Sequence, residues 1–174
     1  MKPRILIFTG DGKGKTTAAA GMMLRELGHG GTAVLVQFLK SDTGSGEIAA
    51  LRTFAPRCAV DIVGLGFVPP PHHPTFARHR EAALKGLETA RQRLADPAFR
   101  MVVLDEICGA ITHALIPVAE VVGLLTGLRD NQVVVLTGRN VPPELIACAD
   151  TVSEIRCLKH GYDQGVHAQK GVEF

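Results

Sequence analysis

The sequence lacks the features that direct a protein into or across a membrane. No apolar run in its 174 residues reaches the roughly 18 that a membrane-spanning helix needs. The N-terminal stretch MKPRILIFTG has a basic start and a short apolar segment, but no small-residue cleavage site follows, which argues against a signal peptide. We therefore expect a cytoplasmic protein that has no membrane partner.

Closely spaced cysteine pairs are also missing. The wide spacing of the four cysteines, in a chain of this size, predicts buried free thiols in a reducing compartment rather than a disulfide framework. These cysteines are Cys58, Cys108, Cys148 and Cys157.

There is little excess charge of either sign. Lysine and arginine number 19 against 17 acidic residues, and this balance gives no indication of a nucleic-acid partner. Hydrophobic residues make up 46% of the chain, which argues against disorder. The length suits one domain with one core over residues 1–174.

Short apolar segments alternate with helical patterns along the chain. The strands that we predict are 4–9, 33–38, 59–65, 100–106, 132–138 and 151–158. The helices that we predict are 15–27, 47–54, 75–96, 107–114, 117–128 and 142–149. Strands that are apolar throughout and alternate with helices indicate an α/β fold with a mostly parallel six-stranded sheet covered on both faces. The more polar last strand is expected at an edge.

The longest predicted helix is amphipathic. Thr75 is expected to cap its N-terminus. Its apolar residues are expected on one face: Phe76, Ala83, Leu84, Leu87 and Leu94.

Chemically suggestive segments follow several of the strands. Right-handed crossovers place the loops that follow parallel strands along one edge of the sheet, where ligands bind. We therefore expect four segments to gather at one site: the glycine loop 9–17, the proline loop 66–74, the acidic pair 105–106 and the segment 137–139.

The segment TGDGKGKTT at residues 9–17 is typical of a phosphate-binding loop between a strand and a helix. Bare backbone there can surround a phosphate, Lys15 can reach its oxygens, and the Thr16 hydroxyl can bind Mg²⁺. Lys13 adds a second cation, and Thr9 stands where the general motif has glycine. The alternative is a glycine-rich turn that binds nothing.

The segment VVLDE at residues 102–106 supplies the acidic partner that such a loop requires. A carboxylate at the end of a buried strand beside the loop can hold Mg²⁺ or its waters. Either Asp105 or Glu106 fits this role, and the alternative is an ordinary pair of solvated acids.

These motifs predict a nucleoside triphosphate but not its reaction. No NKxD-like segment is present, which disfavours a GTPase. A small-molecule kinase would need an arginine-rich lid, whereas Arg91 and Arg93 lie on a helix whose pattern is that of a solvated face.

Several stretches together resemble the P-loop ATP:corrinoid adenosyltransferases, which act on cob(I)alamin or cob(I)yrinic acid a,c-diamide. The family also lacks the first glycine of the general motif, which accounts for Thr9. The matching stretches are TGDGKGKTTAAAG (9–21), QFLK (37–40), GE (46–47), MVVLDEI (101–107), LTGRNVPPELIACADTVSEI (136–155) and KHGYDQGVHAQKGVEF (159–174).

The resemblance implies a single RecA-like domain, usually a homodimer, with ATP, Mg²⁺ and a reduced corrinoid as ligands and a flavoprotein-type electron donor. The phosphates lie in the loop in reversed order, so that Co(I) attacks the ribose C5′ and triphosphate leaves. The residues that match the family's ATP-binding loop are Gly10, Asp11, Gly12, Lys13, Gly14, Lys15, Thr16 and Thr17. Lys13, Lys15 and Arg139 are the expected catalytic residues, although Arg139 also fits a structural ion pair.

This chemistry requires little from the protein beyond position and charge. Co(I) is already a strong nucleophile, and the sequence shows no Ser/His/Asp or Cys/His arrangement. Two other interpretations stay open: a P-loop kinase or ATPase for another small molecule, and a non-catalytic module that binds ATP and corrinoid.

The proline loop is the main departure from the family, which typically has GFTWE where this chain has GFVPPPHHP. Phe67 matches and is expected at the corrinoid, but Pro69 replaces the tryptophan. His72 and His73 are either metal ligands or solvated side chains.

Overall fold

The computed structural model describes residues 1–41 and 44–173. These residues form a six-stranded sheet in the order β3-β2-β4-β5-β1-β6, and all the strand pairs are parallel. The strands are β1 (Arg4–Thr9), β2 (Ala33–Gln37), β3 (Cys58–Ile62), β4 (Met101–Asp105), β5 (Val133–Thr137) and β6 (Thr151–Glu154). The predicted α/β class and parallel sheet are confirmed.

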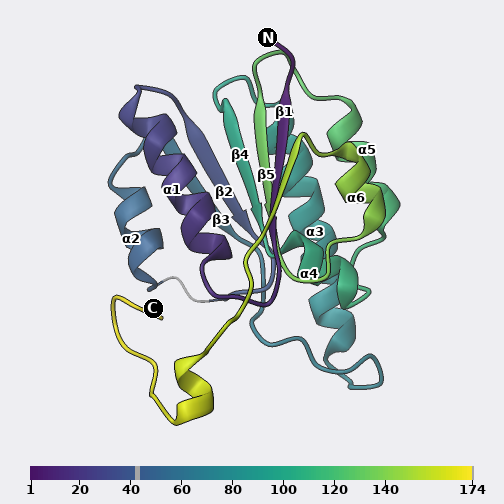
Figure 1. The fold of residues 1–174 in the computed structure, drawn as a ribbon. Helices are drawn as coiled ribbons and strands as arrows, with labels where there is room; N and C mark the ends of the chain where they lie inside the picture. The colour runs from purple at the N-terminus through teal and green to yellow at the C-terminus, as the bar shows by residue number, and fades with distance from the viewer. Residues whose placement is uncertain (42–43, 174) are drawn as a thin grey trace.

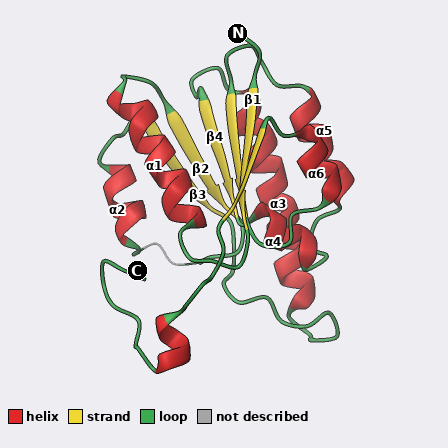
Figure 2. Cartoon of the chain, viewed as in Figure 1, coloured by secondary structure: helices red, strands yellow, loops and turns green. Residues whose placement is uncertain are grey.

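Helices cover both faces of the sheet, with α1 and α2 on one face and α3 to α6 on the other (Figures 1 and 2). They are α1 (Lys15–Gly28), α2 (Gly46–Arg52), α3 (Phe76–Ala95), α4 (Ile107–Thr112), α5 (Val118–Thr126) and α6 (Pro143–Cys148).

The central strands are apolar throughout because each face packs into its own core. In β2, Val34 and Val36 belong to the core under α3 to α6, whereas Leu35 belongs to the core under α1 and α2. Successive side chains of a strand point to opposite faces, so a strand covered on both sides needs apolar residues at every position.

The last strand lies at an edge as predicted, but it ends at Glu154 rather than at residue 158. Its partner β1 ends at Thr9, which pairs with Glu154. Beyond that point the Ile155 N–H donates to the carbonyl of Thr9, the last residue of β1, and the Ile155 carbonyl accepts from Gly12 N–H in the loop that follows. The strand therefore ends where its neighbour β1 ends.

Two details predicted for α3 are wrong. Thr75 occupies the N-cap position but makes no side-chain capping bond, because its hydroxyl contacts His73 Nδ1 at 2.9 Å. Leu84 is exposed, whereas Ala83, Leu87 and Leu94 are buried. The buried stripe is narrower than the apolar pattern suggested.

Other helices and strands begin or end a few residues away from their predicted bounds. β3 spans Cys58–Ile62 because its partner β2 ends at Gln37, opposite Ile62. α2 begins one residue earlier than predicted, at Gly46, and ends at Arg52.

The four cysteines are free thiols, but they are not uniformly buried. Cys58 and Cys108 are buried, Cys148 is half-buried and Cys157 is exposed. Cys157 is exposed because the chain has already left the sheet at that point.

Arg93 is not the solvated side chain that its helix pattern predicted. It forms two hydrogen bonds to Asp61, of 2.7 and 3.0 Å, and its guanidinium lies over the Phe99 ring. Arg93 is therefore fixed to the sheet rather than available to a lid.

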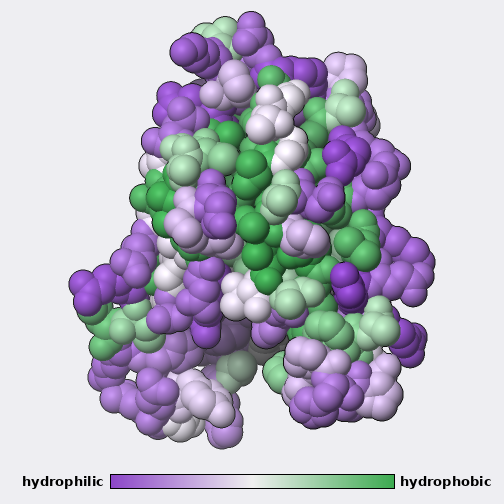
Figure 3. Space-filling view, turned by 90° about the vertical axis from the view of Figure 1, so that its right-hand side faces the viewer, coloured by the Kyte–Doolittle hydropathy of each residue, from purple (hydrophilic) through white to green (hydrophobic). Residues whose placement is uncertain are grey.

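After β6 the chain leaves the sheet and forms an arm that carries a short 3₁₀ helix, η1 (Gly161–Gln164) (Figure 1). Within the described residues, no helix is both long and apolar enough to cross a membrane. On the side at the right of Figure 1, apolar side chains form a central band bordered by hydrophilic ones (Figure 3).

Candidate nucleotide-binding site

A cavity of about 650 Å³ opens at the carboxyl ends of the strands. The glycine loop from Asp11 to Thr17 lines it, together with Lys40, Glu106 and Arg139. The structure therefore brings together three of the four segments that the sequence placed at one site.

The proline loop lies elsewhere. Phe67 and the three prolines that follow Val68 line a separate cavity of about 330 Å³, together with Phe76 and His113. The loop follows β3, which is the edge strand four positions from β1 in the sheet, so the sheet order separates the two loops.

Backbone conformation and close backbone contacts explain why glycines occupy the phosphate loop. Gly10 and Gly14 have positive φ values of 98° and 115°. A Cβ on Gly10 or Gly12 would lie 2.5 or 2.7 Å from Ile155 O, so the chain leaving β6 leaves no space for side chains there. Thr9 is the last residue of β1 and has strand geometry, so its position does not require glycine.

Lys15 is turned into its own loop. Its Nζ donates hydrogen bonds of 2.7 Å to Gly10 O and to Gly12 O. Burial lowers the pKa of Lys15, and the charge of Arg139 lowers it further, while nearby acids oppose the shift. The carbonyls hold the ammonium at the cavity wall, where a bound anion can take their place.

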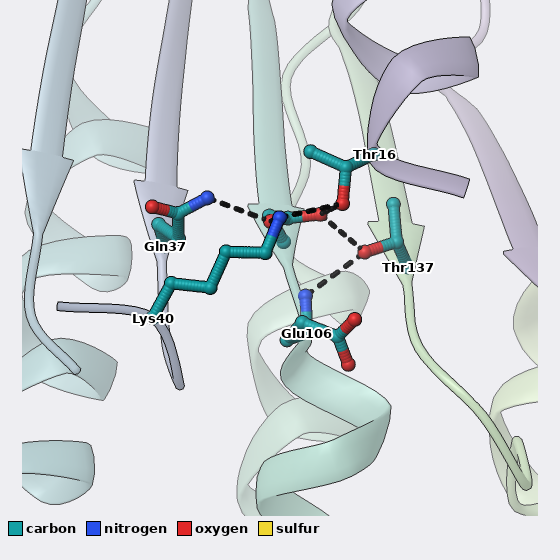
Figure 4. Close-up of polar contacts among 6 residues, drawn as sticks. Thr16, Gln37, Lys40, Glu106 and Thr137 are labelled. Carbon is teal, nitrogen blue, oxygen red and sulfur yellow. Dashed lines mark hydrogen bonds and ion pairs between the residues drawn. The ribbon is translucent and has the colours of Figure 1, made fainter. Parts of the chain in front are cut away.

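Asp105 is the centre of a polar cluster, whose other members Thr16, Gln37, Lys40 and Thr137 are labelled in Figure 4. Its buried carboxylate accepts hydrogen bonds from Thr16 Oγ1 at 2.9 Å, Thr137 Oγ1 at 2.6 Å and Gln37 Nε2 at 3.0 Å. Lys40 Nζ lies 3.8 Å from Asp105 Oδ2 and 3.2 Å from Thr16 Oγ1. Of the two predicted acids, Asp105 is the one that contacts the loop hydroxyl.

Glu106 has a different setting. It adopts a left-handed conformation with a φ of 60°, its N–H donates to Thr137 Oγ1 at 2.9 Å, and the residue lines the cavity. Burial raises the pKa of Glu106, and the charge of Asp105 raises it further. A Cβ on Gly109 would lie 3.1 Å from Glu106 Oε2, so the glycine leaves space for this carboxylate.

Arg139 lies at the mouth of the cavity. Its Nη2 donates to Asp11 O at 3.4 Å, and its Nε lies 3.9 Å from Asp11 Oδ1, with both side chains largely exposed. An exposed pair at this distance contributes little to stability, so Arg139 can exchange Asp11 for an anion.

Comparison with known proteins agrees with this geometry. The family model described as "ATP:corrinoid adenosyltransferase BtuR/CobO/CobP" matches residues 1–174. The chain belongs to this family.

Three relatives illustrate the similarity. The "Corrinoid adenosyltransferase" of Pseudomonas aeruginosa is 39% identical over 172 residues, which is 98% of this chain and 83% of the relative. The "Corrinoid adenosyltransferase CobA" of Salmonella typhimurium is 36% identical over 174 residues, covering 98% and 85%. A "Corrinoid adenosyltransferase" of Sinorhizobium is 40% identical over 177 residues, covering 99% and 81%.

Residues without a predicted role also line this cavity. The tail reaches the cavity through His160, Gly171, Val172 and Glu173, and Lys13 Nζ lies 3.7 Å from Glu173 Oε1. The resemblance of the tail sequence to the family pointed to a role for these residues, but it did not indicate that the tail reaches the cavity. Phe174, which ends that motif, lies outside the described residues.

The proline loop is exposed. Phe67 has 91% of its surface accessible, and His72 and His73 are also exposed. His73 contacts Thr75, two residues further along the chain, and no metal-binding group of three or more His, Cys, Asp or Glu residues occurs in the described part of the chain.

Proposed function

We propose that this protein transfers the 5′-deoxyadenosyl group of ATP to the Co(I) centre of a reduced corrinoid and releases inorganic triphosphate. The observation that carries the proposal is the family match over all 174 residues, in a chain whose phosphate loop meets Glu106 and Arg139 at one cavity. In this reaction the electron pair of Co(I) forms the Co–C5′ bond, and the C5′–O bond breaks.

The glycine loop is proposed to hold the polyphosphate. Within residues 1–41 and 44–173, no side chain caps the N-terminus of α1, so its first N–H groups and the helix dipole favour an anion. Lys13, Lys15 and Arg139 surround the same space and stabilise the negative charge that gathers on the leaving triphosphate. Residues 10–17 are the proposed ATP contacts.

Mg²⁺ is the proposed metal, and the residues present fit it. The Thr16 hydroxyl and the Asp105 carboxylate lie 2.9 Å apart and offer the oxygen ligands that this ion prefers, and Glu106 lies beside them. When bound, the ion neutralises charge on the phosphate oxygens. Thr137 and Gln37 orient the Asp105 carboxylate toward the loop.

Positioning is proposed as the main contribution to the reaction rate. Because Co(I) needs no activating base, the chain has only to present C5′ to the cobalt, and such alignment supplies up to roughly 7–11 kcal/mol. The exposed ring of Phe67 is the proposed contact for the corrinoid, in a loop where Pro69 replaces the family's tryptophan.

The assembly and the location are also proposals. We propose that residues 1–174 act as one domain, that the protein works in the cytoplasm as a homodimer, and that a flavoprotein reduces the corrinoid. Apolar side chains exposed on the arm support a dimer: Leu158, Tyr162, Val166 and Val172. Light scattering during size-exclusion chromatography measures the mass and tests it.

An anaerobic assay tests the function. Reduced cobalamin, ATP, Mg²⁺ and the enzyme are expected to yield the spectrum of a Co–C corrinoid and one inorganic triphosphate for each corrinoid. Lys15→Ala is expected to abolish turnover, while Lys85→Ala, a change at an exposed α3 residue, retains it. Production of ADP and a phosphorylated compound would instead indicate a kinase, and binding of both substrates without Co–C formation would indicate a non-catalytic module.

A further inference from the structure

A lysine ammonium lies beside both proposed metal ligands. Lys40 lies in the segment that follows β2, which ends at Gln37, and Figure 4 shows its side chain reaching toward Thr16. Its Nζ is 3.2 Å from Thr16 Oγ1 and 3.8 Å from Asp105 Oδ2. A single positive charge therefore serves the hydroxyl and the carboxylate together.

The Asp105 carboxylate needs the positive charge of Lys40 to remain ionised and buried at low cost. Its carboxylate is fully buried, and its hydrogen-bond donors are neutral: two threonine hydroxyls and the Gln37 amide. Across residues 1–41 and 44–173, Lys40 is the only cation within 4 Å of this carboxylate. A buried carboxylate is unfavourable without a counter-charge, so the ammonium does here what a bound cation would do.

The two partners differ in how firmly they are held. Asp105 is fixed by three hydrogen bonds, whereas the Lys40 side chain is 42% exposed and lines the cavity shared with Lys13 and Lys15. A polyphosphate in that cavity presents anionic oxygens within the reach of a flexible lysine. Lys40 can therefore leave Asp105 when another anion is available.

We propose that Lys40 holds the place of the divalent cation in the nucleotide-free protein and moves to the polyphosphate when metal and polyphosphate bind. The inference rests on the proposed function, which assigns a cation to Thr16 and Asp105. A metal ion alone must displace the ammonium without giving it a new partner. A metal–polyphosphate complex supplies that partner, so Lys40 couples the binding of the two.

The test measures Mn²⁺ binding to the full-length protein by electron paramagnetic resonance. Wild type, Lys40→Met and Lys40→Gln are compared with Mn²⁺ alone and with the Mn²⁺·tripolyphosphate complex. Without the competing charge, both variants are expected to bind Mn²⁺ alone about tenfold more tightly than the wild type. They are expected to bind the complex more weakly, because the polyphosphate has lost a cationic partner.

These opposite changes distinguish competition between Lys40 and the metal from a merely structural role of Lys40. A structural role would weaken the affinity for Mn²⁺ alone and the affinity for the complex. Lys85→Met is the matched control, because Lys85 pairs with Glu81 on the surface of α3, and neither affinity is expected to change. Lys40→Gln keeps a polar group toward Thr16 and serves as the second variant if Lys40→Met does not fold.

Two results would overturn the inference, and they have different consequences. If the wild type binds the complex but neither Lys40 variant gains affinity for Mn²⁺ alone, Lys40 does not occupy the cation position in the nucleotide-free protein. The proposed function then stands. If the wild type binds neither Mn²⁺ nor the complex, the proposed metal site is wrong and the inference is wrong with it.

Discussion

Replacing Asp105 separates its structural role from its proposed role at the metal. Asp105→Ala removes the acceptor shared by Thr16, Thr137 and Gln37, and two of these groups are fully buried. Each unsatisfied buried polar group costs about 1–3 kcal/mol. We therefore expect Asp105→Ala to lower the free energy of unfolding by about 4 kcal/mol.

Asp105→Asn is expected to be much milder because Gln37 can adapt. The Asn oxygen keeps both threonine hydroxyls as donors, while its NH₂ group faces Gln37 Nε2. Gln37 Oε1 is buried and has no hydrogen-bond partner among the described residues, so a flip of the Gln37 amide presents an acceptor to the new NH₂ group. The change then replaces charge-assisted bonds with neutral ones, at a cost of about 2 kcal/mol.

Urea denaturation measures both free energies, and calorimetry measures the binding of Mg²⁺·ATP. Asp105→Asn is expected to fold and yet lose at least tenfold in Mg²⁺·ATP affinity, because the neutral amide cannot balance the charge of the ion. The double variant Asp105→Asn, Gln37→Leu removes the adapting amide and is expected to be less stable than the sum of its single changes. Equal stability of Asp105→Ala and Asp105→Asn would refute this account of the cluster.

Four further predictions concern residues elsewhere in the chain. Lys15→Ala is expected to lower turnover by at least a hundredfold in the anaerobic assay, and near-normal turnover would contradict its proposed role at the leaving triphosphate. Phe67→Ala is expected to raise KM for the corrinoid while leaving KM for ATP unchanged, and equal changes in both would count against the assigned corrinoid contact. Burial raises the pKa of Cys58 from 9.0 to about 11 and that of Cys108 to about 12. Because the folded state keeps these protons, the stability that they contribute is complete below pH 9 and is lost as the pH rises from there, through 11 for Cys58 and through 12 for Cys108, which urea denaturation across this range measures. Iodoacetamide at pH 8 is expected to label exposed Cys157 and to spare both buried thiols, and rapid labelling of either one would contradict their burial.

The central strands were predictable because a parallel sheet covered on both faces imposes apolar residues at every position. The predicted strand 4–9 matches β1 at both ends. The ends of β3 and β6 were overestimated because each is set by where its neighbour ends, Gln37 for β3 and Thr9 for β6. Such limits depend on pairing, which the local sequence does not contain.

The site was predictable for residues that meet simply because they lie at the carboxyl ends of parallel strands. The phosphate loop follows β1, Asp105 ends β4, and the two meet at the same edge of the sheet, as expected. Lys40 was not predicted, because its contact depends on β2 and β4 being neighbours, with Gln37 opposite Asp105. The same strand order places the proline loop beyond β3, at its own cavity, which the sequence did not indicate.

A crystal structure with Mg²⁺ and ATP tests the direction of the nucleotide most directly. We expect the triphosphate to lie in the glycine loop among Lys13, Lys15 and Arg139, with the ribose C5′ open to a space large enough for a corrinoid. A terminal phosphate directed outward for transfer, with the ribose enclosed by protein, would contradict adenosyl transfer and would favour a kinase.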